Sequence, residues 1–219
     1  MTMIKLAAFD LDGTVADTLA DLAQAMNFAL TEQKLPTYPV DDYRQLVGNG
    51  VDKLIQDAMA GAYTPEGAAK VKADFQRFYA EHCLDFTDAY PGMGELLKKL
   101  HEDGVITAVI SNKPNQFVPR ILQKLYSEHE FAYASGQQPD IPRKPDPTAL
   151  EKLLTFCGVE KDEALYVGDS NVDVAFAHNA GVKVCGVSWG FRGKKELEEA
   201  GADYLVDTAD ELYNIIGTI

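Results

Sequence analysis

The stretch MIKLAAFDLDGT, residues 3–14, begins as an apolar strand and then presents two carboxylates, Asp10 and Asp12, with one leucine between them. A buried strand normally gives way to a neutral turn. Two neighbouring acids repel each other and are costly to remove from water, unless a cation offsets both the repulsion and the cost of desolvation. The stretch therefore predicts a buried strand that ends beside a cation, and the rest of the chain should supply further polar groups there.

The composition predicts a folded chain that does not bind polyanions. Its 219 residues are 46% hydrophobic, which is enough for one large domain or two small ones. The formal net charge is −14, whereas nucleic-acid binding needs clustered Lys and Arg, so we expect no nucleic-acid partner. An anionic substrate would need local cations.

The cysteines and the apolar runs bear on the compartment. Cys83, Cys157 and Cys185 are odd in number, far apart and never in a CxxC pair, which disfavours a disulfide framework or a zinc site. The apolar run before Asp10 is too short for a secretory leader, and no run reaches transmembrane length. We therefore expect a cytoplasmic protein without membrane contact, read from its first residue.

The two parts of the chain differ in their periodicity. Apolar residues at three-and-four spacing, broken by prolines, predict helices over residues 17–33, 40–47, 50–59 and 64–83, with no strand signal in this region. From residue 90 onward, helices alternate with short buried strands. The strands are expected at residues 105–110, 131–134, 164–167, 182–187 and 204–206, and the helices at 92–100, 115–126, 147–157, after 171 and after 206.

This alternation predicts an α/β fold with a doubly wound, mostly parallel sheet of the Rossmann-like type. The first strand has no partner among the residues that directly follow it. The economical explanation is an all-helical insertion. We expect residues 1–15 and 87–219 to form the core domain and residues 16–86 a helical cap domain.

Polar side chains follow several of the predicted strands, at the edge where ligands bind in open parallel sheets. Each has an ordinary alternative, since Ser170 or Asp173 would cap a helix, Ser-Asn would form a turn, and a lone lysine would be solvated. Their joint occurrence at strand ends favours a functional site. The groups are Asp10, Asp12, Gly13 and Thr14; Ser111, Asn112 and Lys113; Lys144; and Asp169 with Asp173.

The residue types point to phosphoryl chemistry. Carboxylates from two strands suit Mg²⁺, and a carboxylate screened by the metal can attack a phosphoryl group to form an aspartyl phosphate. Lys144 and a hydroxyl of Ser111 or Thr14 would hold the phosphoryl oxygens. Asp12 would protonate the leaving oxygen and then take a proton from water, while Gly13 permits close backbone approach.

Four ordered motifs resemble those of the haloacid dehalogenase-like superfamily: FDLDGT, SN, the lysine of RKPDP, and GDSNVD. The resemblance spans essentially the whole chain. It implies that Asp10 is the nucleophile and Asp12 the general acid and base, and that the insertion is a cap that closes over the site. It further implies phosphate contacts from Ser111, Asn112 and Lys144, and Mg²⁺ held by Asp10, the Asp12 carbonyl and Asp169, with Asp173 in support.

Departures within the superfamily narrow the activity. Dehalogenating and phosphonate-cleaving members lack the second aspartate of the first motif, so Asp12 argues against both activities. Sugar phosphomutases usually have a small apolar residue where Thr14 lies and an arginine where Val51 lies, so these two residues argue against a phosphomutase. The segments LVGNGVDKLI, VSWGF and GADYLVDTADEL look like bacterial phosphoglycolate phosphatases. Arg44 and Lys53 flank the Gly-Asn-Gly turn of the cap and are candidates to meet a substrate carboxylate.

The sequence thus predicts a Mg²⁺-dependent phosphatase that acts on a small phosphorylated metabolite, with phosphoglycolate favoured. A phosphotransferase, a phosphomutase or a pyrophosphatase on the same scaffold remains an alternative. A non-catalytic phospho-acceptor module, similar to a response receiver, is an alternative of another class. Both a monomer and a homodimer are compatible with the sequence.

Overall fold

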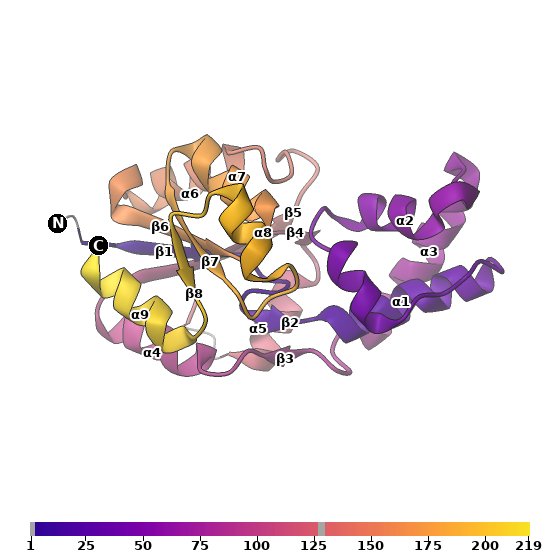
Figure 1. Ribbon diagram of the computed structural model, residues 1–219, viewed down its shortest axis with the longest axis horizontal. Coiled ribbons are helices and arrows are strands. Elements are labelled where there is room, and N and C mark those ends of the chain that lie inside the picture. The colour runs from indigo at the N-terminus through magenta and orange to yellow at the C-terminus, as the bar shows by residue number, and fades with distance from the viewer. Residues whose placement is uncertain (1–2, 127–129) are drawn as a thin grey trace.

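A six-stranded sheet lies at the centre of the computed structural model, which describes residues 3–126 and 130–219 (Figure 1). The strand order is β5-β4-β1-β6-β7-β8, and each neighbouring pair is parallel. The strands are β1 Leu6–Phe9, β4 Ile106–Pro114, β5 Tyr133–Gln137, β6 Ala164–Gly168, β7 Lys183–Val187 and β8 Tyr204–Val206. The predicted α/β class is confirmed, and β1 lies between two strands from the second half of the chain.

Helices cover both faces of this sheet because its strands are apolar on both sides. In β1, Leu6 and Ala8 point into one hydrophobic cluster and Ala7 and Phe9 into the other, as the two-residue period of a strand requires. The first cluster is covered by α6 Thr148–Cys157, α7 Asn171–Ala180 and α8 Gly193–Ala200, and the second by α4 Met93–Glu102, α5 Val118–Leu125 and α9 Ala209–Thr218.

The chain between β1 and α4 forms a mostly helical region beyond the carboxyl ends of the strands (Figure 1). It contains α1 Leu19–Glu32, the 3₁₀ helices η1 Val40–Gln45 and η2 Ala60–Ala62, α2 Val51–Met59 and α3 Pro65–His82. Helix α3 begins with a proline after Thr64, whose hydroxyl accepts the Gly67 N–H. Helices α1 and α3 pack together, with Phe28 stacked on Phe78 at 4.6 Å. The domain boundaries stay a prediction.

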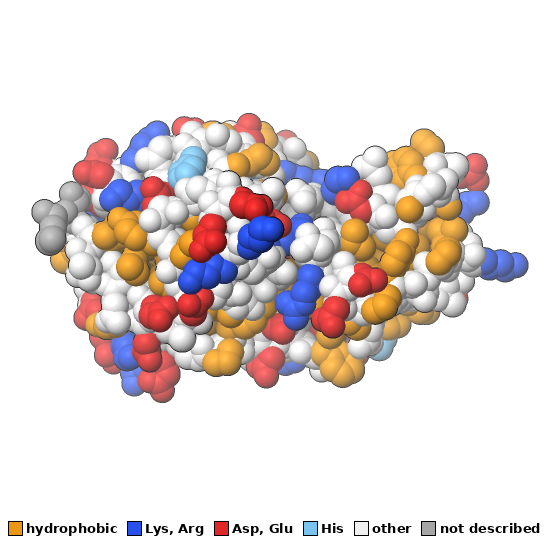
Figure 2. Space-filling view, viewed as in Figure 1, with side chains coloured by type: hydrophobic (Ala, Val, Ile, Leu, Met, Phe, Trp, Pro, Cys, Tyr) orange, Lys and Arg blue, Asp and Glu red, His pale blue; other side chains and the backbone are white. Residues whose placement is uncertain are grey.

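Basic side chains gather where this helical region meets the sheet region (Figure 2). Arg143 donates to Asp52 at 2.8 Å, and Arg192 donates to Gln45 at 2.6 Å. Both arginines belong to the sheet region and both acceptors to the helical region. These contacts hold the helical region over the carboxyl ends of the strands.

Several sequence-based expectations need correction. A strand does occur between residues 16 and 86, because β2 Ala16–Asp17 pairs antiparallel with β3 Asp88–Ala89 where the chain enters and leaves the helical region. Two residues are too few to produce an alternating pattern. Strand β5 begins two residues later than expected and includes Gly136, since pairing with β4 rather than hydrophobicity defines it. Helix α8 was not predicted, and residues 40–45 form a 3₁₀ helix.

Within the described ranges, none of the helices combines the length and the apolar character needed to cross a bilayer.

Candidate active site

Asp10 follows the central strand β1 directly and is buried at its carboxyl end. Its backbone N–H donates to the Val167 carbonyl of β6 at 2.9 Å, which continues the ladder past the end of β1. The Asp10 Oδ1 atom accepts the Leu11 N–H at 2.7 Å, so the carboxylate is oriented by its own turn. The position follows from the sequence, because the central strand of a parallel sheet delivers its last residue to the rim where loops converge.

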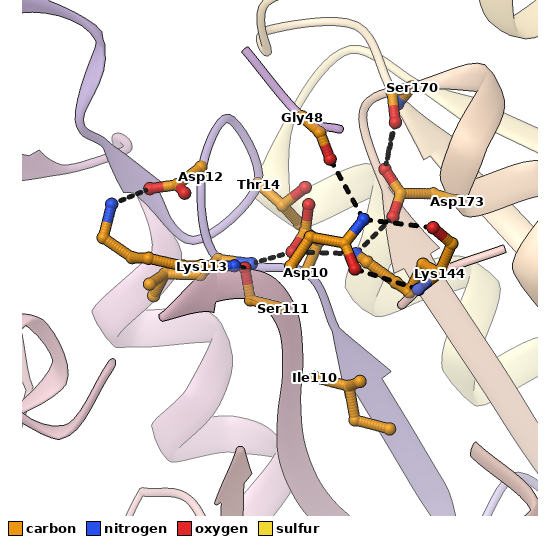
Figure 3. A network of polar contacts seen from close by, with 12 residues as sticks. Asp10, Asp12, Thr14, Gly48, Ile110, Ser111, Lys113, Lys144, Ser170 and Asp173 are labelled. Atoms are coloured by element: carbon orange, nitrogen blue, oxygen red, sulfur yellow. Dashed lines mark hydrogen bonds and ion pairs between the residues drawn. The ribbon is translucent and has the colours of Figure 1, made fainter. Parts of the chain in front are cut away.

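Lys144 joins the carboxylates of this rim (Figure 3). Its Nζ lies 2.9 Å from Asp10 Oδ1, 2.8 Å from Asp173 Oδ1 and 3.0 Å from the Tyr166 hydroxyl. Burial lowers the pKa of Lys144, but Asp10 and Asp173 together outweigh it and hold that pKa well above its usual value. Lys144 is therefore a fixed positive charge beside Asp10.

Three buried carboxylates form a cluster whose negative charge is greater than the positive charge of this one lysine. Oxygens of Asp10, Asp169 and Asp173 all lie within 4.8 Å of one another. Burial raises the pKa of Asp10 to about 6, with Lys144 opposing the shift, and burial with Asp173 and Asp10 raises that of Asp169 well above its usual value. The cluster is short of positive charge, and hard carboxylate oxygens at this spacing suit a divalent cation such as Mg²⁺.

A backbone N–H group, a hydroxyl group and two glycines surround Asp169, another carboxylate of this cluster. The Phe191 N–H donates to Asp169 Oδ2 at 2.7 Å, and the Thr14 hydroxyl lies 3.5 Å from Oδ1. A Cβ atom at Gly13 would lie 2.3 Å from Asp169 Oδ2, and one at Gly190 would lie 2.2 Å from the Asp169 Cβ. Both glycines are therefore required for the backbone to approach the carboxylate this closely, and Gly13 also has a φ of +87°.

Asn112 connects the lysine loop with the helical region. Its Oδ1 accepts the Lys144 N–H at 2.9 Å, and its Nδ2 donates to the carbonyls of Lys144 and Gly48, each at 3.2 Å. The amide thereby positions the backbone of Lys144 and touches the Gly-Asn-Gly turn. Ser111, its neighbour in β4, is buried and lines the same cavity as Asp10.

Asp12 lies on the other side of Asp10 from Lys144 (Figure 3). Its Oδ1 accepts from Lys113 Nζ at 2.9 Å and from the Thr18 hydroxyl at 2.5 Å. Burial lowers the pKa of Lys113, but Asp12 and Tyr79 together outweigh it and raise that pKa above its usual value. Each acid of the first motif thus has its own buried lysine.

A cavity that is partly open to solvent separates Asp10 from the helical region. Its polar lining comes from the first motif and from the end of β4, and the opposite wall is mainly aliphatic and aromatic. The lining consists of Asp10, Asp12, Leu22, Val47, Gly48, Gly50, Val51, Leu54, Phe75, Tyr79, Ser111, Asn112, Lys113, Pro114 and Phe117. The space suits a small molecule that carries a polar head toward Asp10.

The structure brings most of the predicted site residues together and leaves two apart. Asp10, Thr14, Lys144, Asp169 and Asp173 converge, as do the first-motif and β4 residues described above. Arg44 instead contacts Asp41 and the Gly190 carbonyl, and Lys53 pairs with Asp57 on an exposed face. Neither residue lines the cavity.

Sequence analysis named Lys113 at the end of a strand without a role and did not single out Tyr166 or Gly190, although all three have clear roles in this geometry. Lys113 binds Asp12, the Tyr166 hydroxyl contacts Lys144, and Gly190 admits Asp169. The signal for Lys113 was available, since it directly follows the Ser-Asn pair at the end of a buried strand. Tyr166 and Gly190 carried no signal, because their roles arise only from packing against the lysine and the carboxylate.

Comparisons with known proteins agree with this geometry. A family model described as haloacid dehalogenase-like hydrolase matches residues 7–187, which include all four motifs. The chain belongs to the haloacid dehalogenase-like hydrolase family. It is 34% identical over 222 residues to the phosphoglycolate phosphatase of Mannheimia succiniciproducens, covering 98% of this chain and 99% of that protein. It is 36% identical over 208 residues to that of Pseudomonas syringae pv. tomato, covering 93% of this chain and 76% of the relative.

Solved structures extend the likeness to the whole fold of this haloacid dehalogenase-like hydrolase. The crystal structure of a predicted phosphoglycolate phosphatase from Haemophilus somnus 129pt superposes with a TM-score of 0.91 at 32% identity. The match covers 98% of this chain and 99% of that chain. The similarity therefore includes the helical region over the cavity as well as the sheet.

Proposed function

We propose that this chain is a Mg²⁺-dependent phosphatase of small phosphomonoesters, with phosphoglycolate the favoured substrate. One observation carries the proposal: a buried carboxylate, Asp10, lines a cavity while Lys144 and an acidic cluster flank it. The names of the relatives support the same activity. The three free cysteines support a reducing cytoplasm as its compartment.

In the first step, an Asp10 carboxylate oxygen attacks the phosphorus of the ester. The bond between phosphorus and the leaving oxygen breaks, and Asp12 gives its proton to that oxygen, so an alcohol leaves and an aspartyl phosphate forms. Lys144 lies 2.9 Å from Asp10 and would neutralise the phosphoryl oxygens there, together with the Ser111 hydroxyl.

In the second step, water attacks the phosphorus of the aspartyl phosphate. Asp12 takes a proton from the water, the bond between phosphorus and the Asp10 oxygen breaks, and phosphate is released with the Asp10 carboxylate restored. Asn112 contributes by holding the Lys144 backbone and the Gly48 carbonyl at the same time. The apolar wall of the cavity excludes other water from the intermediate.

The acidic cluster would hold the metal. Asp10 and Asp169 would be direct ligands, with the Asp12 carbonyl, and Asp173 would support them. When bound, Mg²⁺ would screen the charge between the nucleophile and the phosphoryl group. The raised pKa values of Asp10 and Asp169 support this assignment, because both carboxylates are buried with too little compensating charge.

Replacement of the nucleophile tests the proposal. Asp10→Asn should remain folded and lose phosphate release from phosphoglycolate under Mg²⁺ by roughly 10³-fold or more, as expected when covalent catalysis is removed. Asp146→Asn is the matched control, because Asp146 is exposed near Lys144 and its carboxylate accepts the N–H and the hydroxyl of Thr148. The measurement is steady-state release of inorganic phosphate, with circular dichroism to verify the fold.

Two outcomes would contradict the proposal. Undiminished phosphate release from Asp10→Asn would exclude Asp10 as nucleophile. A wild-type protein that accumulates a long-lived acyl phosphate without multiple turnovers would be a phospho-acceptor module rather than a phosphatase.

A further inference from the structure

Among the described residues that line the cavity over Asp10, one has a basic side chain. Of the residues that line it, Asp10 and Asp12 are acidic and Lys113 is basic, while most of the others are apolar. The Lys113 side chain is only 2% exposed, and it extends from β4 to the end of the cavity beside Asp12. A buried lysine in an apolar wall is costly unless anions accompany it.

Among the described residues, no basic side chain of the helical region lines the cavity. Lys53 pairs with Asp57, Lys72 with Asp52, and Arg44 contacts Asp41, all on exposed side chains. The helical region instead contributes apolar side chains to the lining, among them Val47, Val51 and Leu54. A leaving group that extends from a phosphate at Asp10 into the cavity would therefore meet Lys113 and, among the described residues of the lining, no other lysine or arginine.

Lys113 retains the capacity to bind a further anion. An ammonium group has three N–H donors, and Asp12 accepts one of them at 2.9 Å. The Nζ atom lies 4.8 Å from the centre of the Tyr79 ring, which extends from α3. The Tyr79 hydroxyl is buried and interacts with Lys113, and among the described residues it has no further hydrogen-bond partner. Lys113 and Tyr79 thus lie together in the lining of the cavity, and each retains capacity to donate to a further group.

We infer that Lys113 and the Tyr79 hydroxyl form a subsite for a carboxylate on the leaving group of the substrate. This inference rests on the proposed phosphatase function and specifies its substrate class: phosphate esters of short hydroxy acids, anionic at both ends. The phosphate would lie against Asp10 and Lys144, and the carboxylate against Lys113 and Tyr79. Lys113 and Tyr79 are specificity-determining residues in this arrangement.

The remaining walls of the cavity reinforce this selectivity. Leu54, Phe75 and Phe117 offer no hydrogen bonds to the hydroxyl groups of a sugar phosphate, whose burial there would leave those groups unpaired. A neutral leaving group of the same size would leave the Lys113 and Tyr79 donors unpaired instead. Either mismatch lowers kcat/KM relative to a short hydroxy-acid phosphate.

The test compares two substrates that differ in the one group concerned, 2-phosphoglycolate and 2-hydroxyethyl phosphate. The wild-type kcat/KM should favour phosphoglycolate by roughly 10- to 100-fold, the range of a hydrogen bond to a charged group. Lys113→Met should abolish this preference, even though loss of the contact with Asp12 slows both substrates. Tyr79→Phe should reduce the preference severalfold.

Lys70→Met is the matched control, because Lys70 is an exposed lysine of α3 paired with Glu66, and it should keep the full preference. Equal slowing of both substrates by Lys113→Met, with the preference intact, would overturn the inference and leave Lys113 only a positioning role. If that variant does not fold, an unchanged preference in Tyr79→Phe overturns it. A wild-type protein that hydrolyses neither ester refutes the proposed function itself, whereas one that hydrolyses both equally refutes only the subsite.

Discussion

Lys144 forms ion pairs with two buried carboxylates, so its removal should destabilise the fold in a pH-dependent way. Asp10 and Asp173 lie 2.9 Å and 2.8 Å from its Nζ. In Lys144→Met, at about pH 8 in chelator, the free energy of unfolding should fall by about 3–5 kcal/mol, because two buried charges lose their partner. At about pH 5 the loss should be smaller, since the pKa of Asp10 is already raised to about 6 and the carboxyl can protonate.

Urea denaturation at both pH values measures this difference. Lys152→Met, a substitution of an exposed lysine on α6, should change the free energy of unfolding little at either pH. An equal loss for Lys144→Met at both pH values would contradict the assignment of the destabilisation to uncompensated carboxylates.

The acidic cluster predicts that Mg²⁺ stabilises the fold more at neutral than at acidic pH. Burial raises the pKa of Asp10 from 3.8 to about 6 and that of Asp169 well above 3.8. The folded state therefore binds protons more tightly than the unfolded state, and without a divalent cation its stability falls as pH rises through about 6. Mg²⁺ competes with those protons, so the increase in Tm on adding it should be larger at about pH 8 than at about pH 5.

Differential scanning calorimetry with Mg²⁺ and with chelator at each pH measures the increase. Asp169→Asn should abolish most of it, because that substitution removes a carboxylate of the cluster. An increase of equal size at both pH values would argue against binding by carboxylates with raised pKa values.

At the scale of elements, Asp21 in the first turn of α1 binds residues 86–87, where the chain returns from the helical region to the sheet. Its buried carboxylate accepts the N–H groups of Phe86 and Thr87 and the Thr87 hydroxyl, the last at 2.7 Å. Asp21→Ala leaves these donors without an acceptor and should lower the free energy of unfolding by about 3 kcal/mol. Asp42→Ala, at an exposed position of η1, should have little effect.

Chemical denaturation of both variants measures the difference. A change within experimental error for Asp21→Ala would mean that water reaches and satisfies those backbone donors. The contact could not be predicted from sequence, since Asp21 lies at an ordinary first-turn position where acids are common on electrostatic grounds alone.

At the scale of the whole molecule, Arg192 connects the sheet region to the turn that covers the cavity. It donates to the Gln45 side chain at 2.6 Å and to the Val47 carbonyl at 2.9 Å. Arg192→Ala should increase hydrogen exchange of residues 45–52 and raise KM by roughly two- to tenfold, because closure of the helical region loses two hydrogen bonds. Lys195→Ala, on the exposed side of α8, serves as the control.

Hydrogen exchange followed by mass spectrometry locates the effect. Unchanged exchange across residues 45–52, together with an unchanged KM, would show that Arg192 does not hold the helical region in place. Asn112 contacts Gly48 in the same turn and Arg143 contacts Asp52 in α2, so combined substitutions should add to the effect of Arg192→Ala.

The sequence by itself determined the class of fold and the edge of the sheet that carries the polar groups. Alternating helix and strand signals from residue 90 onward are local, and parallel strands bring their carboxyl ends to one rim. That reasoning places Asp10, Asp169 and Lys144 near one another without any knowledge of distances. Their catalytic and metal-binding roles stay predictions.

Only the tertiary structure decided how the first two acids are partnered. Asp10 is paired with Lys144, whereas Asp12 is paired with Lys113, which lies 101 residues away along the chain. The same packing sets Tyr79 of α3 beside Lys113 and leaves Arg44 and Lys53 outside the cavity. These relations depend on how the helical region docks against the end of β4, and no local pattern encodes that docking.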